Sequence, residues 1–193
     1  MSQLQTPVQT DAWVKASWDD YIQAVEDPAY EKAKGYYYDG QMRIEAMPTG
    51  PEHAGDHTII LFAISLLCTL RGISVKGLVG CSYRKAGVRE CQPDMSYYIG
   101  EHAQTVPQTG SAIDLNSFPP PDLAIEVSHT TLSDDLGKKR LLYEEMGIAE
   151  YWVVDVENAQ IIAFEISNQD QGSRRITTSQ VLPGLSLGVL EAA

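Results

Sequence analysis

The spacing of hydrophobic and polar residues changes several times along the chain, and each change marks an expected element. In residues 17–28 apolar side chains recur every three or four positions, which predicts a short helix with Ser17 as its N-cap. Asp39-Gly40 lies between two apolar runs and predicts a β-hairpin. Residues 52–71 carry a wide apolar stripe, which predicts a long helix packed on the core.

The second half of the chain alternates between strand and helix patterns. In residues 119–128 the side chains of Leu123, Ile125 and Val127 share one face of a predicted strand. A helix is expected over 133–150, followed by further strands. The order helix, hairpin, helix, strands, helix, strands predicts an α/β fold with a mixed β-sheet flanked by α-helices.

Length and composition narrow the class of protein. The chain has 193 residues with 44% hydrophobic residues, which suits one domain over 11–193 after a flexible tail at 1–10 and excludes general disorder. The net charge of −12 argues against a protein that coats DNA non-specifically, but allows a partner bound through a divalent cation. Three cysteines without a CxxC pair and no visible signal peptide predict a cytoplasmic protein, and no apolar run is long enough to span a membrane.

Two polar residues interrupt apolar patterns in the C-terminal half. Glu126 lies within an apolar strand, where an ionised carboxylate needs a cation or hydrogen-bond donors. Lys139 falls on the helix face that Leu136 and Tyr143 share, and this face should pack on the sheet. A partly buried lysine needs an anion, which Glu126 could supply. From this pattern alone, a structural ion pair and a functional one are both open.

Three stretches together resemble a known family. They are QPD at 92–94, PPDLAIEV at 120–127 and DLGKKRLLYEEMGIAEYWVVD at 135–155. The pattern is similar to that of the Uma family of restriction-endonuclease-like proteins in the PD-(D/E)XK nuclease superfamily, over roughly residues 15–190. The resemblance implies a restriction-endonuclease-like core, metal-dependent endonuclease activity on the phosphodiester bonds of DNA, and a homodimer.

The resemblance also implies a role for individual residues. Asp94 matches the motif aspartate and Glu126 the acidic residue of the (D/E)XK element. Together with the backbone carbonyl of Val127, they would hold Mg²⁺ or Mn²⁺ through hard oxygen ligands. Ser128 stands where the motif lysine is expected, and Lys139 matches a lysine that has moved to the following helix. Asp94, Glu126 and Lys139 are therefore the predicted catalytic residues.

Other residues are expected to contact the substrate or to support the site. His53 matches a histidine that precedes the long family helix. Gln41 stands where the family has a glutamate after the hairpin turn, and Glu52 could substitute for it. The supporting candidates are His53, Glu52, Asp122, Ser128 and Tyr143, and for Asp122 a structural role is favoured.

Two alternatives remain beside the nuclease hypothesis. His53 and His57 have the i, i+4 spacing of a zinc pair, but Ala54 stands where a zinc protease of the HExxH type needs its glutamate. The zinc protease is therefore disfavoured. The second alternative is a catalytically inactive nuclease-like fold that acts as a binding or assembly module. Ser128, Gln41 and the net charge of −12 favour it.

Overall fold

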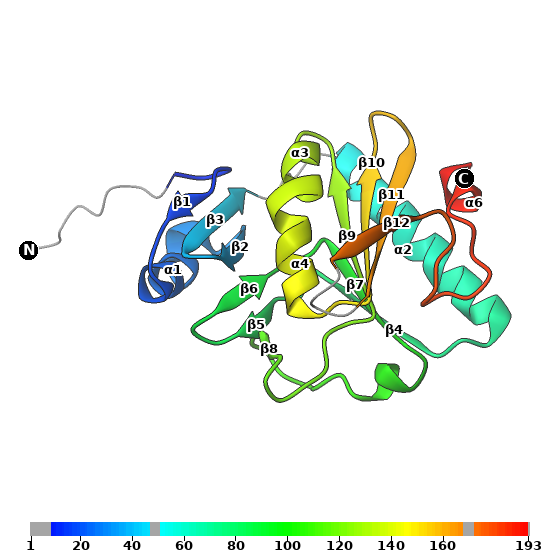
Figure 1. The fold of residues 1–193 in the computed structure, drawn as a ribbon, viewed down its shortest axis with the longest axis horizontal. Helices are drawn as coiled ribbons and strands as arrows, with labels where there is room; N and C mark the ends of the chain where they lie inside the picture. Colours follow the sequence, from blue (N-terminus) through cyan, green and yellow to red (C-terminus); the bar gives the residue numbers. More distant parts are fainter. Residues whose placement is uncertain (1–8, 47–50, 168–171, 193) are drawn as a thin grey trace, which may run out of the picture.

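Two six-stranded β-sheets and the helices packed on them make up the fold (Figure 1). The structure is a computed structural model that describes residues 9–46, 51–167 and 172–192, with only the backbone of 51–54. The first sheet has the order β1 (Val14–Lys15), β3 (Gln41–Ala46), β2 (Ala33–Tyr38), β6 (Arg89–Cys91), β5 (Tyr83–Lys85) and β8 (Ile113–Asp114). The second has the order β12 (Ser173–Ile176), β11 (Gln160–Ile166), β10 (Glu150–Asp155), β9 (Leu123–Ser128), β7 (Met95–Ile99) and β4 (Val75–Val79).

Both sheets are mixed. In the first sheet β5 and β8 run parallel, and in the second β9 and β10 run parallel, while the other strand pairs are antiparallel. The α/β class predicted from the sequence is confirmed. The sequence predicted one mixed sheet, however, and the structure has two. The pattern of apolar residues identifies strands but does not say which strands pair.

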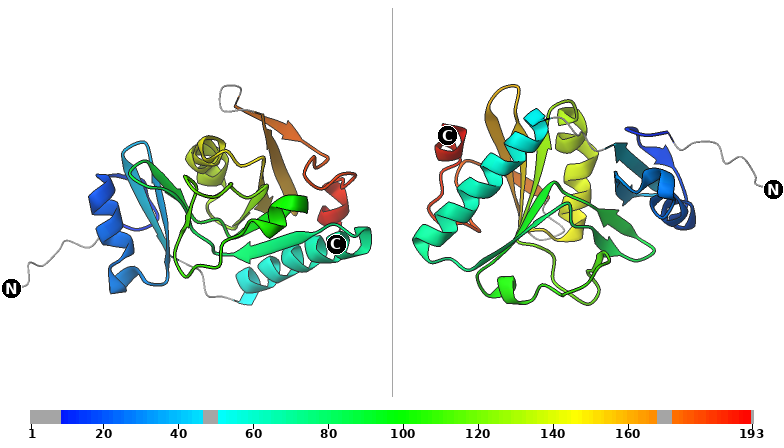
Figure 2. Two further views of the ribbon diagram at one scale, coloured as in Figure 1. Left: turned by 90° about the horizontal axis from the view of Figure 1, so that it is seen from below. Right: turned by 180° about the vertical axis from the view of Figure 1, so that it is seen from behind.

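Helices lie on both sides of the second sheet, and the N-terminal helix lies against the first sheet (Figure 2). The α-helices are α1 (Trp18–Val25), α2 (Pro51–Arg71), α3 (Leu132–Asp134), α4 (Arg140–Met146) and α6 (Gly188–Glu191). A π-helical segment, η3 (Asp135–Lys139), joins α3 to α4, and two short 3₁₀ helices are η1 (Pro28–Tyr30) and η2 (Gly100–Gln104). Helix α2 packs on one face of the second sheet and α4 on the other.

The N-terminal helix and hairpin follow the sequence closely. Ser17 and Asp20 form the expected capping box at the start of α1. Asp39 and Gly40 both have positive φ, 50° and 66°, as the two-residue turn between β2 and β3 requires. Gly35 in β2 lies against α1, where an added Cβ would come within 2.6 Å of the Tyr21 hydroxyl. The helix therefore packs directly on the backbone of β2.

Successive side chains of β2, β3 and β9 point to opposite faces of their sheets, and the two faces meet different surroundings. In β9, Leu123, Ile125 and Val127 pack in the core beneath α2, as predicted. Glu126 points to the opposite face, toward the first sheet and the η3–α4 segment. In β2 the side chains of Lys34 and Tyr36 lie on the side away from α1. Polar side chains of the two sheets, among them Lys34 and Glu126, therefore face one another.

The long helix α2 is only partly a core helix. Its inner face, with Ile60, Ile64 and Cys68, packs on the second sheet as expected. The predicted stripe also included Ile59, Phe62, Leu66 and Leu70, and these four are exposed. The prediction was wrong for them because the helix carries apolar residues on two opposite faces, and only one face meets the sheet.

The helix predicted from residue 133 is bent in the structure. It begins at Leu132, one residue before the expected start, with Thr131 at the N-cap position. Gly137 has non-helical angles (φ −99°, ψ −108°), and the turn around it is π-helical. The helix ends at Gly147 in the left-handed conformation, φ 81°. The irregular turn holds both Asp135 and Lys139 in the interior.

Of the predicted tail at 1–10, residues 1–8 lie outside the described residues. Thr10 forms an isolated bridge with Ile44, so the chain pairs with β3 already at this point. The single domain over 11–193 stays a prediction. Within the described residues, none of the helices combines the length and hydrophobicity that a membrane crossing demands.

Candidate active site

Asp94 and Glu126 lie together where the two sheets face one another. Asp94 immediately precedes β7, and its Oδ2 accepts a hydrogen bond of 2.8 Å from the backbone N–H of Val127 in β9. Asp94 is 3% and Glu126 2% exposed. Adjacent strands therefore bring two acidic residues, far apart in sequence, to one buried place.

A lysine from the first sheet joins these two carboxylates. The Nζ of Lys34 in β2 forms an ion pair with Asp94 Oδ1 and lies 3.5 Å from Glu126 Oε2. Lys34 is 3% exposed. An ammonium group that bridges two carboxylates compensates the charge that they carry at a site where little of either side chain is exposed. Lys34 therefore lies where any other cation shared by Asp94 and Glu126 would also lie.

Lys139 binds a second set of carboxylates. Its Nζ is 2.9 Å from Glu45 Oε2 in β3, 2.9 Å from Asp135 Oδ1 and 3.8 Å from Glu126 Oε1. The side chain is 1% exposed and also lies over the ring of Tyr36. The residue that interrupted the apolar helix face therefore does meet Glu126, as its position suggested. It connects the η3 turn to both sheets.

Two tyrosine hydroxyls complete the surroundings of Glu126. Tyr143 in α4 donates to Glu126 Oε1 at 2.6 Å, and Tyr36 in β2 donates to the same oxygen at 3.0 Å. Both tyrosines are fully buried. These donors hold the carboxylate in one orientation and leave Oε2 on the side of Lys34.

Burial and neighbouring charges shift the pKa values of the two acids in opposite directions. Burial alone would raise the pKa of Asp94, but Lys34 and His57 outweigh it and lower the pKa to about 2. Burial raises the pKa of Glu126 to about 8 against the opposing effect of Lys139 and Lys34. Asp94 is thus ionised at neutral pH, whereas Glu126 readily holds a proton while no further cation is bound.

The two lysines stay charged. Burial would lower the pKa of Lys34, but Glu126 and Asp94 raise it above the ordinary value. Burial likewise opposes the charge on Lys139, and Glu126, Glu45 and Asp135 raise its pKa well above the ordinary value. Burial would raise the pKa of Glu45, but Lys139 and Lys34 lower it. The lysines are therefore permanent cations of the site, not bases that titrate near neutrality.

A small pocket opens onto this cluster. Its volume is about 80 Å³, enough for several water molecules but not for a nucleotide. Lys34, Glu45, Asp94 and Glu126 line it, together with Asp11, Ala46, Val127, His129, Thr130 and Thr131. Lys139 is not part of this lining among the described residues. A larger substrate would have to lie at the mouth, with only one reacting group at the carboxylates.

The donor set of the pocket fits a hydrated magnesium-like ion. Among the described residues, no group of three His, Cys, Asp or Glu side chains is placed to hold a metal by itself. Mg²⁺ is usually bound by one or two carboxylates with water in its remaining positions, which Asp94 and Glu126 can supply. The ion-pair network joins five carboxyl groups (Glu45, Asp94, Glu126, Asp134 and Asp135) to Lys34, Arg43 and Lys139. This excess of negative charge favours a bound divalent cation.

Two comparisons with known proteins bear on the family and the fold of this chain. The family model of Uma2, described as "Putative restriction endonuclease", matches residues 18–190. The chain belongs to the Uma2 family. A solved structure from Anabaena variabilis ATCC 29413, a "putative nuclease belonging to DUF820", is similar to this Uma2 chain with a TM-score of 0.63 and 17% identity. The similarity covers 91% of this chain and 97% of that one, and it supports the fold. Comparison with curated proteins gives no match.

The structure brings some of the predicted supporting residues of this Uma2 protein to the cluster and leaves others away from it. Tyr143 contacts Glu126 directly. Ser128 is buried at the end of β9, with its hydroxyl 3.5 Å from that of Thr131. Asp122 accepts hydrogen bonds from the backbone N–H of Ile99 and contacts His102, at the other end of β9.

The remaining predicted residues lie around the hairpin and the start of α2. His53 and Glu52 lie outside the residues whose side chains are described. Gln41 at the start of β3 accepts a hydrogen bond of 2.8 Å from Lys138 and does not line the pocket. His57 Nε2 is 3.5 Å from Asp94 Oδ1, although His53 was the expected histidine. For His57, the only signal in the sequence was its place one helical turn after His53.

The sequence did not reveal Lys34 and Glu45 as members of the site. The two residues face each other across the β2–β3 pair, and their side chains share one face. The family pattern has a glutamate at the position of Gln41. Glu45 lies four residues later on the same face of β3, and its carboxylate lines the pocket. Strict alternation from the Asp39-Gly40 turn would have placed Lys34, Arg43 and Glu45 together. Nothing in the local pattern says which sheet that face meets.

Proposed function

We propose that this Uma2 protein is a metal-dependent endonuclease that hydrolyses phosphodiester bonds of DNA. One observation carries the proposal: Asp94 and Glu126 line one small pocket together with Lys34. Two carboxylates beside a fixed ammonium group are the residue types that metal-assisted phosphodiester hydrolysis needs. Family membership and the fold of the Anabaena structure support the same reaction class.

Asp94 and Glu126 are the proposed ligands of Mg²⁺ or Mn²⁺, with the carbonyl oxygen of Val127 as a further donor. When bound, the divalent cation supplies Lewis acidity toward the phosphate and acidifies a water molecule. Lys34 is at the pocket wall, and its ammonium can orient that water or balance charge on the phosphate. Lys139 acts through Glu126 and Glu45, because its amine lies between these carboxylates and not at the pocket wall.

Two further parts of the proposal concern partners and location. The expected substrate is DNA, and the negative net charge means that binding has to rely on the cation and on local basic groups. We also propose that the protein forms a homodimer and acts in the cytoplasm. The three cysteines are unpaired, which agrees with a reducing compartment.

The second candidate function is a binding or assembly module without catalysis. Lys34 favours it, because the ammonium already compensates both carboxylates without any metal. Ser128 and Gln41, which depart from the family pattern, favour it as well. The two functions differ in whether the chain binds a divalent cation. The nuclease requires Asp94 and Glu126 to exchange Lys34 for such a cation, and the module does not.

Incubation of the purified chain with supercoiled plasmid tests the proposed function. Nicking is expected with Mg²⁺ or Mn²⁺ and none with EDTA, because the carboxylates need the cation to act on a phosphodiester. Conversion of the supercoiled form on an agarose gel measures the rate. Intact plasmid with either cation, together with no Mn²⁺ binding at millimolar concentration by a correctly folded chain, would favour the non-catalytic module.

Lys34→Met is expected to tighten Mn²⁺ binding by about tenfold, because it leaves two buried carboxylates without their own cation. The same variant is expected to cleave DNA more slowly, since the pocket loses the ammonium that faces the phosphate. Titration followed by electron paramagnetic resonance of free Mn²⁺ measures the affinity.

Lys138→Met is the matched control for this prediction. Lys138 donates to Gln41 at 2.8 Å, outside the carboxylate cluster, so the variant loses the same unit of charge at another place. Its Mn²⁺ affinity should stay close to that of the wild type. Equal or weaker Mn²⁺ binding by Lys34→Met would contradict a shared position for the lysine and the metal.

A further inference from the structure

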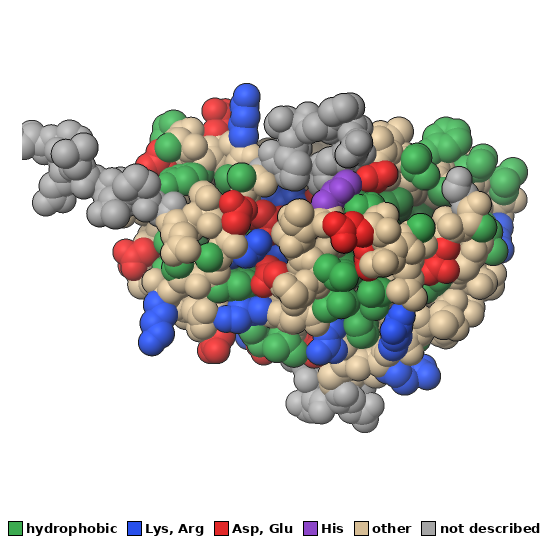
Figure 3. Space-filling view, turned by 90° about the horizontal axis from the view of Figure 1, so that it is seen from above, with side chains coloured by type: hydrophobic (Ala, Val, Ile, Leu, Met, Phe, Trp, Pro, Cys, Tyr) green, Lys and Arg blue, Asp and Glu red, His purple; other side chains and the backbone are tan. Residues whose placement is uncertain are grey.

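Helix α2 carries an apolar stripe on the face that points away from the sheet. Ile59, Phe62, Leu66 and Leu70 follow one another at spacings of three and four, so they form a single line along the helix. They are 58%, 69%, 46% and 77% exposed. Figure 2 shows α2 on the outside of the molecule, and apolar side chains gather along this edge in Figure 3. We call these four residues the α2 outer stripe.

The α2 outer stripe is about as large as the biggest apolar patches that monomeric proteins leave exposed. The exposed parts of the four side chains amount to roughly 500 Å², near the upper end of what monomeric proteins leave exposed in one patch. A stable interface between two proteins buries roughly 800 Å² on each side, with an apolar core and a polar rim. The stripe supplies such a core, and the polar Ser65 and Thr69 flank it.

The charge distribution favours a second copy of the same chain as the partner. Each copy has a net charge of −12, so two copies repel one another over most orientations. Residues 58–70 of α2 contain no Asp, Glu, Lys or Arg. Two facing α2 helices would therefore place no like charges directly opposite each other along this stretch. The hollow beside it is also lined by Asp56, Asp155 and Glu191, and each of these contacts a partner in its own chain, which are His129, Asn158 and the N–H of Ile161. The same net charge disfavours an anionic lipid surface.

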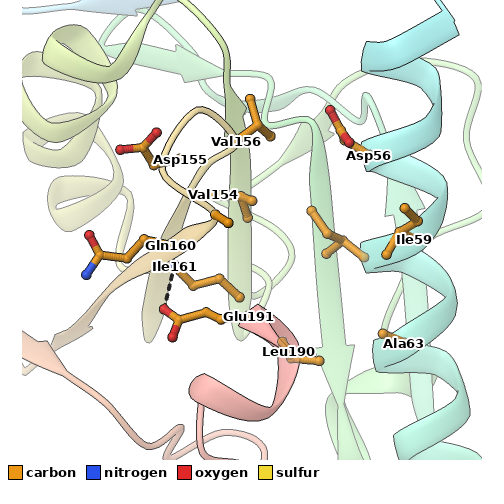
Figure 4. A pocket seen from close by; sticks show the side chains of 12 residues that line it. Asp56, Ile59, Ala63, Val154, Asp155, Val156, Gln160, Ile161, Leu190 and Glu191 are labelled. Atoms are coloured by element: carbon orange, nitrogen blue, oxygen red, sulfur yellow. Dashed lines mark hydrogen bonds between the residues drawn. The ribbon is translucent and has the colours of Figure 1, made fainter. Parts of the chain in front are cut away.

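A hollow lies beside the α2 outer stripe, so that the surface has both a projecting part and a recessed part. The hollow has a volume of about 210 Å³ and lies between α2, the β10–β11 turn and α6 (Figure 4). Ile59 and Ala63 of α2 form one wall, and Val154, Val156 and Leu190 contribute further apolar side chains. Phe62 lies between Ile59 and Ala63 in the sequence of the same helix and is exposed. In a twofold dimer every copy presents both features to the other.

We propose that two copies of this chain associate through their α2 outer stripes, with Phe62 of each copy packed at the hollow beside Ile59 and Ala63 of its partner. This inference names the surface for the homodimer proposed above and does not depend on DNA cleavage. The same helix carries His57 next to Asp94, and the stripe begins two residues after His57.

Sedimentation velocity of the full-length chain, without DNA or metal, tests the interface. The wild type is expected to be a dimer at about 100 µM and to dissociate on dilution. Phe62→Glu places two like charges into the apolar core and is expected to weaken the dimer by about a hundredfold. Phe62→Leu keeps an apolar side chain and should keep the dimer.

Val88→Glu is the matched control for this substitution. Val88 is 51% exposed at the turn between β5 and β6, away from the stripe, so the same change of charge should leave the dimer intact. Circular dichroism checks that each variant is folded. A wild type that is monomeric at about 100 µM overturns the proposal. So does a dimer that Phe62→Glu and Val88→Glu weaken equally, since this would mean general repulsion or a different surface.

Discussion

Asp94→Asn is expected to lower metal-dependent DNA cleavage by about a thousandfold or more, because several kcal/mol of transition-state stabilisation depend on the bound cation. Asparagine has nearly the size of aspartate and can still accept the hydrogen bond from the N–H of Val127. It lacks the negative charge that the metal and Lys34 require. Single-turnover nicking of plasmid in Mn²⁺ measures the rate, and Mn²⁺ titration measures the lost affinity.

Asp122→Asn is the control for this prediction. Asp122 is the other aspartate next to the strands that carry the site, but it binds Ile99 and His102 at the far end of β9. Its exchange should change cleavage by no more than about threefold, as expected for a residue that touches neither substrate nor metal. Undiminished cleavage by a folded Asp94→Asn variant would place the activity elsewhere in the preparation or on other residues.

The sequence predicted those parts of the fold that depend on neighbours in the chain. The N-cap of α1 at Ser17, the turn at Asp39-Gly40 and the end of α2 at Arg71, before Gly72 with its positive φ, are local. Each is dictated by a backbone conformation or a hydrogen bond within a few residues. The alternation of β9 likewise placed Glu126 on the face opposite Ile125. These local features do not depend on how the helices and strands pack against one another.

The contacts between side chains of the two sheets could not be predicted from local sequence patterns. Glu126 and Lys139 were recognised because each breaks an apolar pattern. Lys34 and Glu45 break no such pattern, since β2 and β3 look like strands with one polar face exposed to solvent. That face is instead buried, so that Lys34 becomes a partner of Asp94 and Glu126, and Glu45 becomes a partner of Lys139. Burial of a polar face is a property of the assembled fold, and the periodicity of the sequence does not show it.

The apolar stripe of α2 failed as a prediction for the opposite reason. Apolar residues on two faces of one helix give a strong signal for burial on both sides. The sequence does not say whether the second face meets the same chain or another one. Leu66 and Phe62 remain exposed in the single chain, and the interface proposed above would account for them.

Lys139→Met is expected to lower the free energy of unfolding by about 3–5 kcal/mol at pH 7, the cost of breaking a buried ion pair from one side. Methionine fills nearly the same volume, so that the loss reflects charge more than a cavity. The variant leaves Glu45, Asp135 and Glu126 without the amine that now lies within 2.9, 2.9 and 3.8 Å of them. Urea denaturation followed by circular dichroism measures the change, with EDTA present to exclude metal binding.

The pH dependence separates this electrostatic origin from a packing defect. Burial opposes the charge on Lys139 but the carboxylates raise its pKa well above the ordinary value, so its contribution is complete at neutral pH and is lost only in strong alkali. In the variant Glu45 and Glu126 lose the charge of Lys139, which lowers the pKa of both, so these two carboxyl groups bind protons more readily in the folded state than in the unfolded state. The variant's deficit should therefore shrink as the pH falls from 8 to about 5.

Lys138→Met provides the comparison within the same turn of helix. Lys138 lies over the ring of Trp13 and donates to Gln41, so its loss should cost about 1 kcal/mol or less and vary little with pH. A variant of Lys139 that unfolds at pH 7 but folds at pH 5 would support the argument, because protons would then replace the ammonium. Equal stability of the Lys138 and Lys139 variants at every pH would mean that the buried amine does not hold the carboxylates together. Glu126 would then depend on Lys34 and the two tyrosines alone for its position.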